Sequence, residues 1–444
     1  SDGGYHSRSD SYTFYSFNGN KVNTDAQTSY SSAWTSSGDV ASALYDADNG
    51  TLSFYVNGVS QGDAFTSIDT TKIWHFVAYT KDSTAVACNF GQMRFKYPMP
   101  SGYAALNTTA LPEATIPNGS DHFNVVLRNG FGTSGGTVTV GFSPGLLWEK
   151  TRNISGSHYL YDAVRGAGKI LFSNSTNAES TDTDQVNAFT STGYTLGNNE
   201  WSTSTTLVGW AWNAGSSTVS NTDGSITSNV RANPSAGISI ITANWTSSGG
   251  TIGHGLNAVP EFIIAKNRDN TSNWPVWATA LGSGKGVILD ENLASYSNDY
   301  LASTLPTSSV ITVRDFGSGS ASDYIVYAFT SVAGFSHFTT FEGTGSSDPV
   351  FVYCGFRPRW ILRKNIDAEK NWYLHDTTRD TFNICTKEFQ PHNNSSEGDH
   401  DAMDILSNGF VMRTSNAQHN NSGSTHIVAA FAENPFQANG GLAR

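Results

Sequence analysis

Two acidic and basic pairs have the residue types that could act on a glycosidic bond. Asp162 precedes Arg165 by three positions, and Asp376 precedes Arg379 by the same interval. Hydrolysis of a glycan needs two carboxyl groups that face each other across the scissile bond at a defined separation. In such a site the aspartates would serve as acids and the arginines as electrophiles.

A structural role for these pairs is the favoured interpretation. A third segment of the same pattern has Ala278 and Leu281 at the matching positions, so the fold tolerates the loss of the pair. Each pair therefore predicts a local salt bridge that fixes the turn after a strand, and surface pairs of this kind contribute little to stability. We predict no catalytic residue, and a polysaccharide-degrading enzyme is the alternative.

The densest group of possible metal ligands lies in one polar stretch near the C-terminus. Its members are His392, Asp399, His400, Asp401 and Asp404. The stretch has no regular apolar pattern and is typical of an exposed loop, in which such residues are solvated. A metal site would need these ligands to converge on one point, which the pattern does not indicate. Neither a metal nor a cofactor is predicted.

Asp46, Asp48 and Gly50 have the spacing that opens a calcium-binding loop. The twelfth position of such a loop carries a glutamate, and this chain has Asn57 there. Asn49 followed by Gly50 is a strong signal for a tight turn, because both residue types tolerate positive φ. We therefore predict a hairpin at this point.

Tryptophan could contact a ligand by stacking on sugar rings. Most tryptophans recur at equivalent positions of alternating strands, and we predict that these pack in the core. They are Trp148, Trp210, Trp212, Trp274, Trp277, Trp360 and Trp372. Trp34, Trp201 and Trp245 do not recur and stand in stretches rich in Ser and Thr, so they are the candidates for a glycan-binding or receptor-binding surface.

One pattern that would position these residues is written three times. Residues 144–150, 260–266 and 358–364 share the form Pro-x-apolar-apolar-apolar-x-Lys, and each copy ends on an alternating aromatic strand. The spacing from the proline to that strand is nearly the same in each copy. A chain built by repeating one module is usually a scaffold or a binding surface. We therefore expect three homologous β units.

Composition indicates an all-β protein. Only 14% of the residues are charged, 43 are glycine, and short apolar runs alternate with Asn-Gly turns. The net charge of −12 argues against nucleic acid as a partner. No apolar run approaches the roughly 18 residues of a membrane span, so no membrane insertion is expected. Three scattered cysteines imply no disulfide framework.

Residues 44–58 and 88–95 resemble parts of a SPRY domain. Leu-Tyr-Asp-Ala-Asp-Asn-Gly-Thr-Leu-Ser-Phe-Tyr-Val-Asn-Gly at 44–58 is similar to its central hairpin, and Cys-Asn-Phe-Gly-Gln at 88–92 with Phe95 is similar to its closing strand. This resemblance implies a concanavalin-like β-sandwich, a binding fold. A SPRY domain has more strands before Gly38 than 37 residues can form, and the chain begins with Ser rather than Met. We therefore expect an incomplete sandwich, in a chain that is a fragment, a processed product or simply missing its start.

The repeated region resembles modules of tail fibres and similar virion proteins of tailed phages. Residues 158–166, 354–360 and 430–436 carry this resemblance. The expected organisation is a partial SPRY-like sandwich and three units with their connecting segments. The boundaries are 1–110 for the sandwich, 111–119 for a linker, 120–215 for the first unit, 216–233 for a connector, 234–332 for the second unit and 333–444 for the third.

The resemblance implies a non-enzymatic virion protein, a tail fibre or similar external appendage that attaches to host-surface glycans. Its expected partners are other copies of itself in a homotrimer, other virion proteins, and a host glycan or receptor. Weak contacts multiplied by valency would give firm attachment. The alternatives are a capsid-decorating or purely structural fibre protein, a polysaccharide-degrading tailspike, and a cellular surface adhesin.

Overall fold

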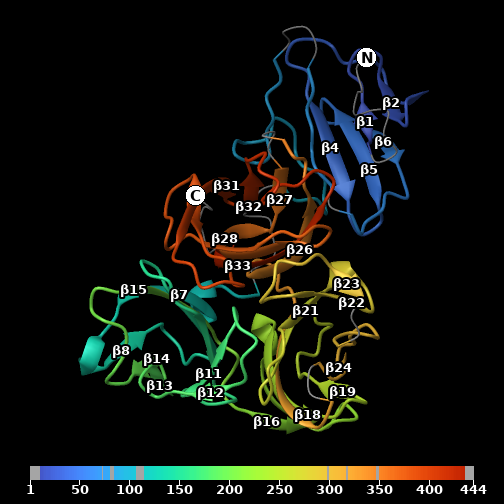
Figure 1. Cartoon of the computed structure of the whole chain (residues 1–444). Helices are drawn as coiled ribbons and strands as arrows, with labels where there is room; N and C mark the ends of the chain where they lie inside the picture. Colours follow the sequence, from blue (N-terminus) through green and yellow to red (C-terminus); the bar gives the residue numbers. More distant parts are fainter. Residues whose placement is uncertain are drawn as a thin grey trace. The chain divides into compact units, whose positions relative to one another are not determined.

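The prediction of an all-β protein is confirmed. The computed structural model describes residues 11–72, 74–80, 85–106, 115–297, 300–316, 319–346 and 350–435, and its regular elements are strands joined by loops and single 3-10 turns (Figure 1). The chain divides into two compact units, residues 1–112 and 113–444. In the described part of the chain, no helix has the length and apolar character needed to cross a membrane.

The first unit contains two three-stranded antiparallel sheets. One is made of β1 (Thr13–Phe14), β2 (Asn20–Asn23) and β3 (Ala26–Ser29), and the other of β4 (Ala41–Asp46), β5 (Thr51–Val56) and β6 (Val59–Phe65). The predicted hairpin between β4 and β5 is confirmed. Asp46 fixes its turn, because its Oδ1 accepts hydrogen bonds from the backbone N–H groups of Asp48 and Asn49, both at 3.0 Å.

Three sheets of the second unit, called the large sheets below, have four core strands in the same order. The first contains β7 (Phe123–Asn129), β15 (Thr206–Trp212), β9 (Leu146–Thr151), β10 (His158–Asp162), β11 (Lys169–Phe172) and β12 (Ser180–Thr181). The second contains β16 (Val219–Asn221), β17 (Ser228–Asn233), β18 (Ile238–Trp245), β25 (Ser322–Phe329), β20 (Phe262–Asn267), β21 (Pro275–Ala278), β22 (Lys285–Ile288) and β23 (Tyr296–Ser297). The third contains β26 (Ser336–Glu342), β33 (Thr425–Pro435), β28 (Phe356–Asn365) and β29 (Trp372–Asp376).

The shared core of these sheets is four antiparallel strands in a fixed order. The orders are β7-β15-β9-β10, β18-β25-β20-β21 and β26-β33-β28-β29. In each, the strand that ends the sequence pattern lies between the first strand and the strand that follows the proline. The stretch 216–233, expected as a connector, forms β16 and β17, which extend the second sheet because Val230 of β17 packs into the core.

A second sheet, of three, two and four strands in turn, accompanies each large one. These are β8 (Gly136–Thr139), β14 (Gly193–Leu196) and β13 (Val186–Phe189); β19 (Gly250–Gly253) and β24 (Val310–Val313); and β27 (Val350–Tyr353), β32 (Gly409–Met412), β31 (Gly398–Leu406) and β30 (Cys385–Glu388). In the third group, Ile361 and Val428 of the large sheet share a buried cluster with Val352 and Met412 of the second one. This is the packing of a β-sandwich.

The other faces of the three large sheets meet in one central core. Trp212 and Trp360 lie edge to face with ring centroids 5.4 Å apart, and Phe431 contacts both Trp212 and Phe329. Figure 1 shows the green, yellow and red strands of this unit next to one another. The recurring tryptophans are buried, so their predicted role in the core is confirmed. A remaining cavity of about 20 Å³ is lined by apolar side chains, which favours a dry interior.

Candidate functional site

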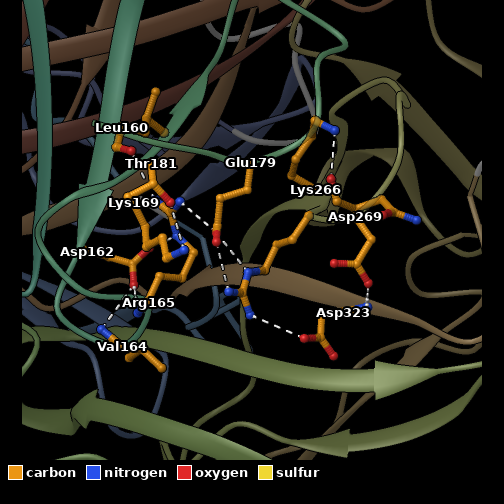
Figure 2. Close-up of polar contacts among 12 residues, drawn as sticks. Leu160, Asp162, Val164, Arg165, Lys169, Glu179, Thr181, Lys266, Asp269 and Asp323 are labelled. Atoms are coloured by element: carbon orange, nitrogen blue, oxygen red, sulfur yellow. Dashed lines mark hydrogen bonds and ion pairs between the residues drawn. The ribbon is translucent and has the colours of Figure 1, made fainter. Parts of the chain in front are cut away.

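Asp162 and Arg165 form a buried ion pair at the end of β10. Neither side chain has exposed surface. The Asp162 carboxylate accepts hydrogen bonds from the backbone N–H groups of Val164 at 3.0 Å and Arg165 at 2.8 Å, and from the Arg165 Nε (Figure 2). The predicted salt bridge that fixes the turn is therefore confirmed, but the predicted surface position is wrong. Neighbouring sheets cover the turn, which explains the difference.

Charged side chains continue from this pair to the second sheet. Arg165 Nη1 lies 3.2 Å from Glu179 Oε2, and the same carboxylate accepts two hydrogen bonds from Arg268 at 2.9 and 3.0 Å. Figure 2 shows Glu179 between the Arg165 turn and the strand that carries Asp323. The hydroxyl of Tyr327 on β25 donates to Asp162 Oδ2 at 2.9 Å. This network joins the first sheet to the second.

An equivalent network joins the third sheet to the first. Asp376 at the end of β29 pairs with Arg379, and both side chains are fully buried. Trp210 Nε1 on β15 donates to Asp376 Oδ2 at 3.0 Å. Glu397 accepts hydrogen bonds from Arg379 Nη1 at 3.0 Å and from Arg152 Nη2, which lies after β9, at 2.9 Å. As in the first network, the carboxylate accepts a hydrogen bond from another sheet. The donor lies on the aromatic strand that ends the repeated pattern, called the closing strand below.

The two networks explain why the middle copy lacks the pair. Tyr327 and Trp210 occupy equivalent positions of their closing strands, and the third closing strand has Ala429 there. Ala278 stands where the aspartate would be. The remaining pairing is that of the second sheet with the third. It lacks both the aspartate, which would lie on the second sheet, and the hydrogen-bond donor, which would lie on the third. A buried carboxylate without its partners would be costly, so replacement on both sides is the stable solution.

Each repeated lysine is buried and capped in the same way. The Nζ atoms of Lys150, Lys266 and Lys364 donate to the carbonyl oxygen of the following residue at 2.9, 2.7 and 2.7 Å. None of the three residues has exposed surface. Burial lowers the pKa of Lys150 and Lys364 to about 7 and the pKa of Lys266 to about 8. The lysines therefore stabilise backbone carbonyl groups inside the fold.

The structure distinguishes among the three tryptophans predicted to bind a ligand. The prediction is wrong for Trp245, which ends β18, is 2% exposed and stacks on Tyr324 at 3.7 Å. Its Ser/Thr-rich surroundings begin only after the strand. Trp34 and Trp201 are half-buried, and the Trp201 ring lies edge-on to Tyr159 at 6.1 Å. These two have exposed surface, but they lie in different units of the chain.

The acidic and histidine-rich stretch is only partly the predicted loop: residues 390–397, which include His392, form a loop, and a strand begins at Gly398. Gly398–Leu406 forms β31, because alternate residues such as Met403 and Ile405 enter the sandwich core. Two of the aspartates are paired, Asp399 with Lys387 at 2.6 Å and Asp404 with Arg413. His400 Nδ1 lies 3.0 Å from Glu388. Within the described ranges, three or more His, Cys, Asp or Glu side chains do not gather into a group that could hold a metal.

An open groove of about 550 Å³ lies on the third sandwich. Its walls come from the loop between β29 and β30 and from the turn between β31 and β32. It is lined by Arg357, Thr381, Phe382, Asn383, Ile405, Leu406, Ser407 and Asn408. Phe382, at the edge of the groove, is 82% exposed. An aromatic ring beside amide, hydroxyl and guanidinium groups can both stack on a ligand and hydrogen-bond with it.

Sequence reasoning missed this groove because it sought ligand-binding aromatics among tryptophans. Phe382 stands in the polar stretch Arg-Asp-Thr-Phe-Asn that follows the Arg379 turn. The first two copies of the pattern have no aromatic residue at a matching place. The same rule that selected Trp34 and Trp201, an aromatic that does not recur, would have selected Phe382.

Comparison with known families gives two matches. The SPRY domain family matches residues 1–93, in agreement with the resemblance of that segment. A domain of unknown function, DUF7483, matches residues 118–435, which include all three large sheets. No solved structure matches the chain significantly. Because the second match covers well over half of the sequence, the chain belongs to the DUF7483 family and carries a SPRY domain before the DUF7483 domain.

Proposed function

We propose that the chain is a non-enzymatic structural and adhesive protein of a phage virion. In this proposal it is a tail fibre or similar external appendage, and it attaches the particle to glycans of the host surface. It assembles as a homotrimer with other virion proteins at its attachment point. The groove on the third sandwich is the observation that carries the adhesive part of the proposal.

The chemistry of the groove suits a carbohydrate. Sugars present C–H faces that pack on aromatic rings and hydroxyl groups that pair with amides and guanidinium groups. Phe382 supplies an exposed ring, and Asn383, Asn408 and Arg357 line the same groove. Asn383 is held in place, because its side chain exchanges two hydrogen bonds of 2.8 Å with the backbone of Ile405. A positioned loop costs less entropy on binding than a free one.

The scaffold in this proposal consists of three copies of one module, at 120–215, 234–332 and 333–444. Support comes from the shared strand order of the three large sheets and from the equivalent capping of Lys150, Lys266 and Lys364. A module that is stable through its own core leaves its surface loops to vary. The third copy would then carry the glycan site while all three contribute to the core.

Replacement of Phe382 tests the adhesive function. We expect Phe382→Ala to weaken binding of the purified chain to host-cell surface polysaccharide at least about tenfold, because the exposed ring is the main stacking surface. The polysaccharide is immobilised on a surface, and the binding and release of the purified chain are followed as the chain is added and washed away. Phe17→Ala is the control, since Phe17 is also an exposed phenylalanine but lies in the first unit.

Two outcomes would contradict the proposal. If the unaltered chain binds neither host cells nor their polysaccharides, the adhesive function is wrong and a purely structural fibre or decoration protein is favoured. If reducing ends appear during incubation, the protein cleaves the glycan and the tailspike alternative replaces adhesion. Solution size measurement tests the homotrimer, which a strict monomer would exclude.

A further inference from the structure

The outer face of β27 carries two exposed aromatic side chains. Phe351 and Tyr353 are 42% and 40% exposed, while Val352 between them is 2% exposed and packs inside the sandwich. Alternate residues of a strand share one face and stand about 7 Å apart. The two rings therefore form one aromatic surface on the side of the sheet that faces away from the core.

Strand register connects this surface to the groove. Tyr353 pairs with Gly409 on β32, and Gly409 pairs with Leu406 on β31. Leu406 lines the groove, as does Asn408 next to Gly409. Tyr353, Gly409 and Leu406 therefore form one row across the three strands, and two strand spacings, about 10 Å, separate Tyr353 from Leu406. Aromatic surface and groove thus belong to one continuous area of the third sandwich.

Gly409 leaves the middle of that area without a side chain. A Cβ atom at this position would lie 2.0 Å from the carbonyl oxygen of Val352, so a larger residue does not fit. Gly409 itself is buried, so neighbouring groups cover the backbone between Tyr353 and Leu406. Since Gly409 has no side chain, no side chain of β32 separates Tyr353 from Leu406 along this line of paired residues.

The aromatic pair is specific to the third sandwich. The equivalent strands have the same buried residue type, Val138 in β8 and Ile252 in β19. Their outward positions carry Thr137 and Thr139 in β8, and Thr251 and Gly253 in β19. Gly193 on β14 matches Gly409, because its Cβ would lie 1.8 Å from the Val138 carbonyl oxygen.

The fold therefore does not require the two aromatics. Since the other two sandwiches form with threonine or glycine at these outward positions, Phe351 and Tyr353 are not needed for core packing. Two neighbouring exposed aromatic rings also offer flat apolar faces on which sugar units can stack. A ligand that covers them accounts for their presence.

We propose that this surface extends the groove into a site for a glycan chain of several sugar units, rather than for one terminal sugar. The inference rests on the proposed glycan-binding function. Phe382 holds one part of the chain at the groove, and Tyr353 and Phe351 stack on units further along. Asp404 on β31 lies across β32 from Phe351, because both residues pair with Val411. Its ion pair with Arg413 adds polar groups to the row of residues that contains Phe351.

Oligosaccharide length tests the inference. Calorimetry with chito-, cello- and malto-oligosaccharides of one to six units should give an affinity that rises with length for any series that binds. The double variant Phe351→Ala/Tyr353→Ala should lower the affinity for the long oligosaccharides at least about tenfold. Its affinity for the shortest oligosaccharide that binds should be unchanged. Phe382→Ala should weaken short and long members alike. Thr137→Ala/Thr139→Ala is the matched control at the equivalent positions of the first sandwich.

The outcomes separate this inference from the proposed function. Equal affinity for short and long members, or an equal loss at every length in the double variant, overturns the extended site alone. If none of the oligosaccharides binds, the double variant is tested on immobilised host polysaccharide. Unchanged binding overturns the inference, and a loss of binding that the Thr137→Ala/Thr139→Ala control does not show supports it. If the unaltered chain binds no glycan at all, both proposals fail. Thermal unfolding of each variant shows that the fold is intact.

Discussion

Asp376→Asn is expected to lower the free energy of unfolding of the second unit by about 3–5 kcal/mol. The substitution keeps the size of the side chain but removes the negative charge that faces Arg379, whose side chain is fully buried. Arg379 would then depend on Glu397 alone. An incompletely compensated charge in the interior is among the most destabilising changes a point mutation can make. Urea unfolding followed by tryptophan fluorescence measures the effect.

Two further variants separate the buried charge from general effects of substitution. Trp210→Phe keeps an aromatic ring but removes the indole donor to Asp376 together with part of the buried ring, and it should cost about 1–3 kcal/mol. Asp399→Asn breaks an exposed ion pair with Lys387 and should change stability by less than about 1 kcal/mol. If Asp376→Asn costs no more than Asp399→Asn, the buried network does not contribute as the structure indicates.

The repeated pattern allowed the core to be predicted from sequence. Trp148 and Trp212 recur at positions that alternate along strands, and alternation is what places side chains on one face of a sheet. The same reasoning predicted the Asp162 and Asp376 salt bridges, because each pair is local in sequence. It failed on their burial, which depends on sheets that are distant in the chain.

Long-range partners were beyond sequence reasoning for a physical reason. Trp210 and Asp376 are 166 residues apart, and nothing in the spacing of either residue indicates the other. Trp245 was misjudged because a strand can end directly before a polar turn, so neighbours in sequence describe the turn and not the strand. The groove at Phe382 is formed by two turns that meet only in the folded sandwich.

The free energy of unfolding is expected to rise between about pH 7 and pH 9 because of the three buried lysines. Burial lowers the pKa of Lys150 and Lys364 to about 7 and that of Lys266 to about 8. An unfolded lysine keeps its proton up to about pH 10.4. In this interval the unfolded state therefore binds more protons than the folded state, so stability increases with pH. Over this interval the gain is about 2 kcal/mol each for Lys150 and Lys364 and about 1 kcal/mol for Lys266.

Other buried groups set the upper limit of this increase. Burial raises the pKa of the Cys354 and Cys385 thiols to about 12, and the pKa of Tyr159 and Tyr373 also to about 12. Unfolded thiols and phenols lose their protons at lower pH than these folded groups. The folded state then binds more protons, and stability falls. We therefore expect the maximum near about pH 9.

Lys364→Met isolates the contribution of one lysine. Methionine fills a similar space without a charge, so the rise in the free energy of unfolding between pH 7 and pH 9 should shrink by about a third. Urea unfolding at several pH values measures this slope. Lys285→Met, which replaces an exposed lysine of β22, should leave the slope unchanged. A stability that is flat or falling between pH 7 and pH 9 in the unaltered chain would mean that the buried lysines stay protonated. Their charge would then be stabilised by the carbonyl oxygens that cap them.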